Sequence, residues 1–194
     1  TMISSDFEEK AQLAEKEHSD YISVNMSRSI TPFADLIALL RLIRIFRKLK
    51  PAIVHSHTPK AGLLGMLAGK ISGVPIRLHT VAGLPLMESH GAKRMLLEMV
   101  EKLAYRCATR VYPNSLKLRD FILEAGFCKP GKLKVIGSGS SNGINSAIFK
   151  RTSALEERAD HLRNALLIPQ GYFIFIYVGR LVGDKGVAEL VKAF

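Results

Sequence analysis

Two basic residues occupy a glycine-rich turn near the end of the sequence. The stretch GRLVGDKG, residues 179–186, places Arg180 and Lys185 just after the apolar run YFIFIYV. A guanidinium offers a planar fork of donors to phosphate oxygens, and an ammonium offers a movable point charge. Glycines let the backbone approach an anion closely, and the helix expected next adds its N-terminus. The pattern predicts a phosphate-binding turn; a solvated loop whose cations flank Asp184 is the alternative.

A second stretch of small residues follows an expected strand. GSGSSNGIN, residues 137–145, leaves backbone amides and hydroxyls free to bind a phosphate or a sugar. It lacks the Gly-Lys-Ser/Thr ending of a nucleoside-triphosphate loop, and it does not open a helix as a dinucleotide fingerprint does. The stretch is therefore a candidate substrate contact, and a flexible crossing between domains is the alternative.

Three histidines stand at or near the ends of expected strands. VHSHTPK places His55 and His57 two residues apart on one side of a strand, and His79 ends another. A zinc site needs further ligands, and no acidic or thiol residue has a suggestive spacing, so no metal is expected. No serine nucleophile elbow and no glycosidase-like carboxylate pair is present. These histidines are either structural hydrogen-bonding groups or contacts to sugar hydroxyls.

Short apolar runs alternate with longer helical segments along most of the chain. Strands are expected at residues 21–26, 52–57, 75–80, 110–113 and 132–137, and helices at 32–49, 59–72, 92–108 and 116–126. This order predicts an α/β fold, a Rossmann-like doubly wound parallel sheet. Ligands of such sheets bind at the carboxyl ends of the strands. The segments to consider there are 56–60, 79–85, 113–115 and 137–145.

The sequence changes character after Phe149. A charge-mixed helical segment and the breaker LIPQG precede the apolar run at residues 172–178, which reads as a new buried strand. We expect a first domain over residues 1–149, a linker over 150–170 and the start of a second Rossmann-like domain over 171–194. The opening TMISSDFEEK reads like the interior of a longer product.

The composition narrows the partners. The formal net charge is +11, which favours polyanions, but there is no Trp and aromatic residues make up only 7%, which argues against nucleic acid. Phosphate-bearing small molecules and anionic membrane surfaces remain. No apolar run is long enough to span a bilayer, no signal peptide is visible, and the two cysteines are far apart. We therefore expect a cytoplasmic protein with free thiols, at most peripheral to the membrane.

The helix expected at residues 32–49 has two unlike sides. At 100° per residue its core face carries Leu36, Leu39, Leu42, Ile43, Phe46 and Leu49. The opposite side carries four cations and three large apolar residues: Arg41, Arg44, Arg47, Lys48, Phe33, Ile37 and Leu40. Interleaved basic and apolar residues are typical of a helix that lies on anionic lipid. Packing of this side against a neighbouring protein is the alternative.

Taken together, four stretches resemble retaining GT-B glycosyltransferases of family 4, closest to bacterial members that build capsular and other surface polysaccharides. They are KPAIVHSHTPKAGLLGMLAGKISGVPIRLHTVAGLP, RVYPNS, GSGSSNGIN and YVGRLVGDKG. Each motif is short, but their order and spacing are specific and cover nearly the whole chain. The resemblance implies an enzyme of two Rossmann-like domains with the active site between them. It implies transfer of a hexose or N-acetylhexosamine from a nucleotide-diphosphate sugar to a lipid-linked polysaccharide precursor, without a cofactor.

The resemblance also implies roles for residues of the two glycine-containing stretches. Arg180 and Lys185 match the basic pair that binds the donor diphosphate, and Asn142 and Gly143 match an interdomain turn. Family members usually have an aspartate shortly after that turn, where this chain has Asn145.

A further departure lies in the loop LHTVAGL. Many family members have a histidine that contacts the donor sugar at the position of Ala82, and His79 lies three residues earlier. His79 is therefore a weak candidate for a catalytic role. His57, Lys60 and Gly83 complete the residues that we assign to the substrate cleft.

The resemblance implies that family elements lie outside residues 1–194. The first strand with its glycine-rich acceptor loop would precede Thr1, and a glutamate-containing donor segment would follow Phe194, so this chain alone is expected to be inactive. Two other classes stay open: a non-catalytic sugar- or nucleotide-binding domain, and a dinucleotide-dependent oxidoreductase. The oxidoreductase needs a glycine fingerprint and an acidic ribose ligand about 20 residues later, and neither is present.

Overall fold

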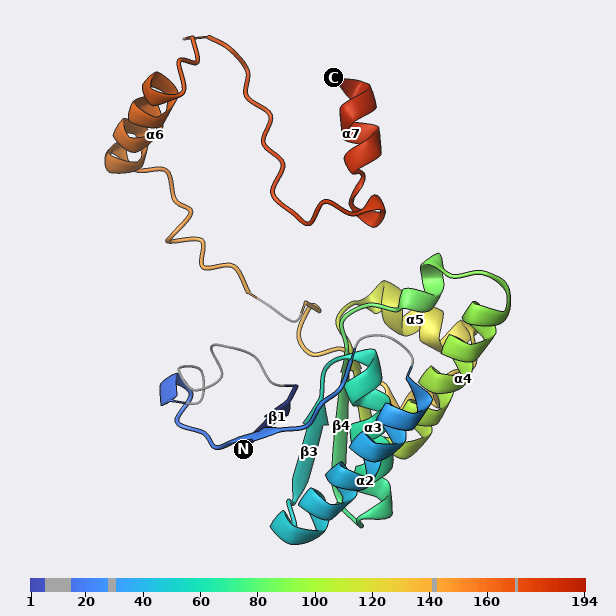
Figure 1. The fold of residues 1–194 in the computed structure, drawn as a ribbon. Helices are drawn as coiled ribbons and strands as arrows, with labels where there is room; N and C mark the ends of the chain where they lie inside the picture. Colours follow the sequence, from blue (N-terminus) through green and yellow to red (C-terminus); the bar gives the residue numbers. More distant parts are fainter. Residues whose placement is uncertain (6–14, 28–30, 141–142, 170) are drawn as a thin grey trace. The chain divides into compact units, whose positions relative to one another are not determined.

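The computed structural model describes residues 1–5, 15–27, 31–140, 143–169 and 171–194 (Figure 1). The chain forms two compact units, Thr1–Gly143 and Ile144–Phe194. All strands that the structure describes belong to the first unit, and each unit is treated separately below.

The first unit contains two parallel sheets. β1 (Met2–Ser4) pairs with β2 (Tyr21–Ser23), and β3 (Ile53–Ser56), β4 (Ile76–Val81) and β5 (Arg110–Pro113) form the second sheet in that order. Parallel neighbours require long crossover connections, and in the second sheet helices between the strands supply them. The predicted parallel α/β fold is confirmed.

Four helices follow the strands of the first unit. They are α2 (Pro32–Leu49), α3 (Pro59–Ile71), α4 (Gly91–Cys107) and α5 (Leu116–Glu124). α2 and α3 begin with proline, whose fixed φ suits the first helical position and whose missing N–H is not needed there. The Ser115 hydroxyl accepts a hydrogen bond from the Leu118 amide and so caps α5. Short 3-10 helices lie at η1 (Pro85–Glu88) and η2 (Pro130–Lys132).

α3 lies between α2 and α4 and contributes to both hydrophobic clusters of the first unit (Figure 1). Leu64 and Ala68 pack with residues of α2, whereas Met66 packs with Tyr105 of α4. The helix approaches the sheet through Gly65 and Gly69. A Cβ at Gly69 would lie 3.2 Å from the Arg77 side chain of β4, and one at Gly65 would lie 3.9 Å from Ser56 of β3.

Several expected elements differ from the structure. β1 was not anticipated, and β2 ends at Ser23, short of the expected residue 26. The strand expected at 132–137 is reduced to one parallel bridge between Leu133 and Val111, with a single hydrogen bond of 3.1 Å from the Lys134 amide to the Val111 carbonyl of β5.

The second unit contains α6 (Ser153–Ala165), η3 (Gly183–Lys185) and α7 (Val187–Ala193). The strand expected at residues 172–178 is absent: the segment has no ladder partner, and its side chains are exposed. A strand is defined by hydrogen bonds to a neighbour, and the described part of this unit offers none.

Candidate active site

The carboxyl ends of β3 and β4 place a serine beside a histidine. The parallel register pairs Ser56 with His79, and Ser56 Oγ lies 2.9 Å from His79 Nδ1. Both side chains are buried, and His79 is only 2% exposed. α3 covers the imidazole so closely that a Cβ at Gly62 would lie 2.3 Å from His79 Cε1. Glycine is therefore required at this position of α3, and the imidazole is held between strand and helix.

The surroundings of His79 keep its imidazole neutral. Burial lowers the pKa of His79 to about 4; a hydrogen bond with Ser56 offsets part of this, and the nearby His55 and His57 add to the lowering. A neutral imidazole exchanges hydrogen bonds but contributes no positive charge near neutral pH. In this geometry His79 is a structural group that fastens β3 to β4, and its role toward a sugar stays a prediction.

The other two histidines lie on the opposite face of β3. Side chains alternate along a strand, so His55 and His57 point away from the face that carries Ser56. His55 Nε2 lies 2.8 Å from Thr80 Oγ1 across the sheet, and the His55 and His57 rings are 4.1 Å apart. Burial, with a smaller contribution from His57, lowers the pKa of His55. This exposed group offers neutral donors and acceptors of the kind that bind sugar hydroxyls.

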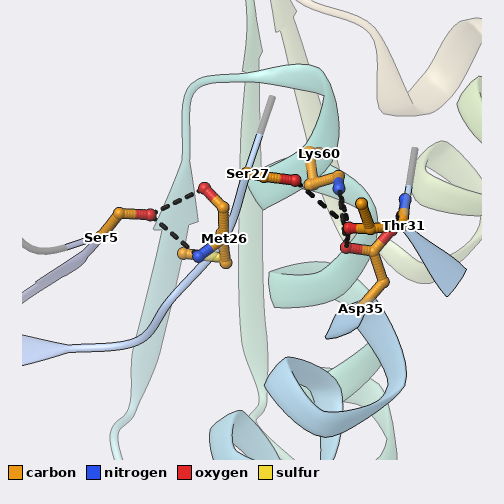
Figure 2. Close-up of polar contacts among 6 residues, drawn as sticks. All are labelled: Ser5, Met26, Ser27, Thr31, Asp35 and Lys60. Carbon is orange, nitrogen blue, oxygen red and sulfur yellow. Dashed lines mark hydrogen bonds and ion pairs between the residues drawn. The ribbon is translucent and has the colours of Figure 1, made fainter. Parts of the chain in front are cut away.

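Lys60 is part of a network that joins the first turns of two helices (Figure 2). Its Nζ donates to Asp35 Oδ1 at 2.6 Å and to Thr31 Oγ1 at 3.4 Å. Asp35 also accepts from the Thr31 amide and hydroxyl, at 3.2 and 3.1 Å. Although burial raises it, the pKa of Asp35 is lowered overall, because the hydrogen bonds from Lys60 and Thr31 and the Lys60 charge favour the carboxylate. The ammonium assigned to the cleft is thus ion-paired at the start of α3.

A serine clasp fixes the chain shortly before this network. Ser5 Oγ donates to the Met26 carbonyl at 2.7 Å and accepts from the Met26 amide at 2.9 Å, which extends the β1–β2 pairing beyond both strands (Figure 2). Ser27 follows directly, with its Oγ 3.2 Å from Thr31 Oγ1. Side-chain hydrogen bonds therefore join Ser5 to Met26 and Ser27 to Thr31.

Asn114, within the segment 113–115 that was expected at the strand ends, connects the two loops expected to bind substrate. Its Nδ2 donates to the Ala82 carbonyl at 2.9 Å, and its own carbonyl accepts from the Ser140 amide. Gly139 has a φ of 92°, and a Cβ there would lie 2.7 Å from the Asn114 carbonyl, so this close approach needs glycine. The loop after β4 and the small-residue stretch thus meet at the end of β5.

The remaining predicted site residues fall in three places. Gly83 lies in the loop after β4 with open space beside its Cα, and Gly143 is exposed at the end of the first unit. Asn142 lies outside the described residues. Arg180 and Lys185 belong to the second unit, where Gly186 follows η3 with a φ of 68° and the Tyr177 hydroxyl donates to the Arg180 carbonyl at 2.8 Å. Their role as a diphosphate-binding pair stays a prediction.

Among the residues that the structure describes, no group of three or more His, Cys, Asp or Glu side chains could hold a metal ion. Among the helices that the structure describes, none combines the length and the apolar character needed to cross a membrane.

Comparison with known protein families decides the class of this domain. Residues 6–139 match the Glycosyl transferase 4-like domain. The chain belongs to this glycosyltransferase family. The resemblance seen in the sequence motifs is confirmed, and the parallel α/β fold of this glycosyltransferase 4-like domain matches the N-terminal half of GT-B enzymes.

Relatives of this glycosyltransferase 4-like chain include bacterial surface-polysaccharide enzymes. It is 42% identical to the capsular polysaccharide biosynthesis glycosyltransferase CapM of Staphylococcus aureus, over 88% of this chain and 44% of the relative. It is 28% identical to the UDP-Gal:alpha-D-GlcNAc-diphosphoundecaprenol alpha-1,3-galactosyltransferase of Escherichia coli, over 87% of this chain and 42% of that enzyme. The chain thus spans less than half the length of these relatives.

Solved structures show the same fold. The Anabaena protein Alr3699/HepE, crystallised with UDP and glucose, superposes with a TM-score of 0.69 at 21% identity, over 94% of this chain and 46% of that one. A glycosyltransferase from Rickettsia africae superposes with a TM-score of 0.65 at 22% identity, over 98% and 48% of the two chains.

Proposed function

We propose that the full-length protein transfers a hexose or N-acetylhexosamine from a nucleotide-diphosphate sugar to a lipid-linked polysaccharide precursor, with retention of anomeric configuration. The observation that carries the proposal is the match of residues 6–139 to the glycosyltransferase 4-like family together with 42% identity to a capsular polysaccharide enzyme. The more distant Escherichia coli relative is named for UDP-galactose as donor and a diphosphoundecaprenol-linked sugar as acceptor. Retention is proposed from family membership.

The first unit supports the acceptor part of this proposal. The larger sheet carries uncharged donors and acceptors near its carboxyl edge, where Nε2 of the exposed His55 lies 2.8 Å from Oγ1 of the half-buried Thr80. Lys60, in the first turn of α3 after β3, is paired with Asp35 at 2.6 Å. Sugar hydroxyls carry no charge, and a small number of polar groups held in fixed positions can bind and orient them.

The second unit supports the donor part. As the glycosidic bond breaks, negative charge accumulates on the departing diphosphate, and preorganised cations stabilise that charge without a metal ion. Arg180 precedes the η3 turn by three residues, and Lys185 is the last residue of that turn. We propose that both bind the diphosphate and act more strongly in the transition state than in the ground state.

The proposed place of the reaction is the cytoplasm, at the inner face of the cell membrane. Both cysteines are free thiols: Cys107 is buried and Cys128 is half-buried. Unpaired thiols suit a reducing compartment, and a lipid-linked acceptor requires access to a membrane surface.

The donor step is tested with the full-length enzyme and its Arg180→Ala and Lys185→Ala variants. Loss of one transition-state contact is expected to cost about 2–4 kcal/mol, or about a thirtyfold to thousandfold loss in kcat. Lys192→Ala, which removes an exposed cation from the neighbouring α7, is the matched control and should keep its turnover. Wild-type turnover in both test variants would overturn the diphosphate assignment. Binding of nucleotide sugar without any transfer would instead favour a binding module.

A further inference from the structure

The outward side of α2 exposes large apolar side chains that a solvated helix does not need. Phe33 is 87% exposed, Ile37 is 68% exposed and Leu36 is 54% exposed. Leu36 was expected in the core but lies about a quarter turn from the centre of the buried face. Leu49, also expected in the core, is exposed because it ends the helix. The buried face is formed by Ala38, Leu42, Ile43 and Phe46.

The exposed residues are segregated along the helix. The α2 surface, as we define it, consists of Phe33, Leu36, Ile37, Leu40, Arg41, Arg44, Arg47 and Lys48, all of them exposed. Its apolar members all precede its cations, so the first half of the helix is apolar outward and the second half is basic. At 1.5 Å per residue the surface is about 22 Å long, and at 100° per residue it spans about 140° of the circumference.

The positive charge of the α2 surface is not compensated within the described part of the chain. None of its four cations makes a hydrogen bond or an ion pair with a described residue. The only acidic residue of α2 is Asp35, which pairs with Lys60, and α3 beside it has no acidic residue. Among the described residues, none supplies the negative charge that this surface calls for, and an anionic partner would supply it.

These features favour an anionic lipid surface over another protein copy. If two copies paired their α2 surfaces in parallel, the cations of one would face the cations of the other. If they paired antiparallel, each would bury unpaired cations against the apolar half of the other, which is costly. At a bilayer the apolar half can enter the boundary between headgroups and acyl chains while the basic half stays over the anionic headgroups.

We propose that the α2 surface docks the protein on an anionic membrane, with the first half of the helix inserted at interfacial depth. The Lys60–Asp35 pair places the first turn of α2 beside the first turn of α3, which follows the carboxyl end of β3. The inserted half thus adjoins the edge of the sheet that carries the candidate acceptor groups. That docking brings these groups close to a lipid-linked acceptor rests on the proposed function, whereas the docking itself does not.

Vesicle flotation tests the charge requirement. The protein is mixed with vesicles of phosphatidylcholine alone or of phosphatidylcholine with phosphatidylglycerol. We expect binding only to the anionic vesicles, and the triple variant Arg41→Gln/Arg44→Gln/Arg47→Gln should partition about a hundredfold less. The matched control Lys150→Gln/Arg158→Gln/Lys192→Gln removes three exposed cations from the second unit and should bind like wild type. Equal losses in both triple variants would overturn the proposal, because net charge alone would then explain binding.

Insertion is tested with single tryptophan reporters, since the chain contains no Trp. Phe33→Trp and Lys48→Trp place one at each end of the exposed α2 surface. We expect lipids brominated on their acyl chains to quench the fluorescence at position 33 strongly and that at position 48 weakly. Equal quenching, or none, would overturn the proposed orientation. Neither assay contains a sugar nucleotide, so both measure membrane binding independently of sugar transfer. If the full-length protein failed to transfer sugar, the two membrane results would still support or refute docking.

Discussion

The buried imidazole of His79 should make stability fall in mild acid. In the unfolded chain this histidine takes up a proton near its usual pKa of 6.5, whereas burial lowers the pKa of the folded state to about 4. Between these values the unfolded state binds more protons than the folded state. Stability is therefore lost as pH falls through 6.5 and levels off near 4.

The expected size of this effect follows from the two pKa values. The shift corresponds to about 3 kcal/mol in the free energy of unfolding, fully lost only below pH 4. That is a large share of the stability of an ordinary domain, about 5–15 kcal/mol. Carboxyl groups also titrate at the acid end, so the contribution of His79 must be isolated by comparison with a variant.

Urea unfolding of wild type and His79→Asn from neutral pH to pH 4 provides that comparison. The stability advantage of wild type should shrink by about 3 kcal/mol over this range. His161→Asn, at an exposed histidine of α6, should show no such trend. NMR titration of the wild-type imidazole tests the same reasoning without a variant. A His79 signal that titrates near 6.5 would refute it.

Further predictions concern packing and the Lys60 network. Gly62→Ala should destabilise the protein by about 1–3 kcal/mol, because the new Cβ would lie 2.3 Å from His79 Cε1. Gly65→Ala in the same helix, where the nearest atom is 3.9 Å away, should be neutral or slightly stabilising in thermal unfolding; equal losses would contradict the packing. Asp35→Asn should cost about 1 kcal/mol in urea unfolding by weakening the bond to Lys60, whereas Asp120→Asn, in an exposed pair, should cost almost nothing. Equal losses in the free energy of unfolding for the two variants would show that the Lys60 network does not stabilise the protein.

The order of elements was predictable because each strand and helix carries its own pattern. Alternation of apolar runs and amphipathic segments indicated the parallel α/β fold, and proline at the first turn located the starts of α2 and α3. Short motifs in a specific order indicated the family.

Tertiary contacts of the candidate site were not predictable in the same way. Lys60 lies 25 residues from Asp35 along the chain, and nothing in the local pattern of either residue names the other. The Asn114 side-chain amide and backbone carbonyl bind Ala82 and Ser140, which lie in two loops that only the folded sheet brings together. The apolar run at 172–178 was a misleading signal, because strand formation depends on a neighbour as well as on side chains. The domain ranges proposed from the sequence stay a prediction.

The central claim is sugar transfer to a lipid-linked acceptor, and one measurement tests it most directly. The full-length protein is incubated with a panel of nucleotide-diphosphate sugars and an undecaprenyl-diphosphate-linked sugar, and the lipid product is analysed by mass spectrometry and NMR. We expect the acceptor to gain one hexosyl or N-acetylhexosaminyl residue with the anomeric configuration of the donor. An acceptor of unchanged mass with every donor, from a folded enzyme that binds nucleotide sugar, would contradict it.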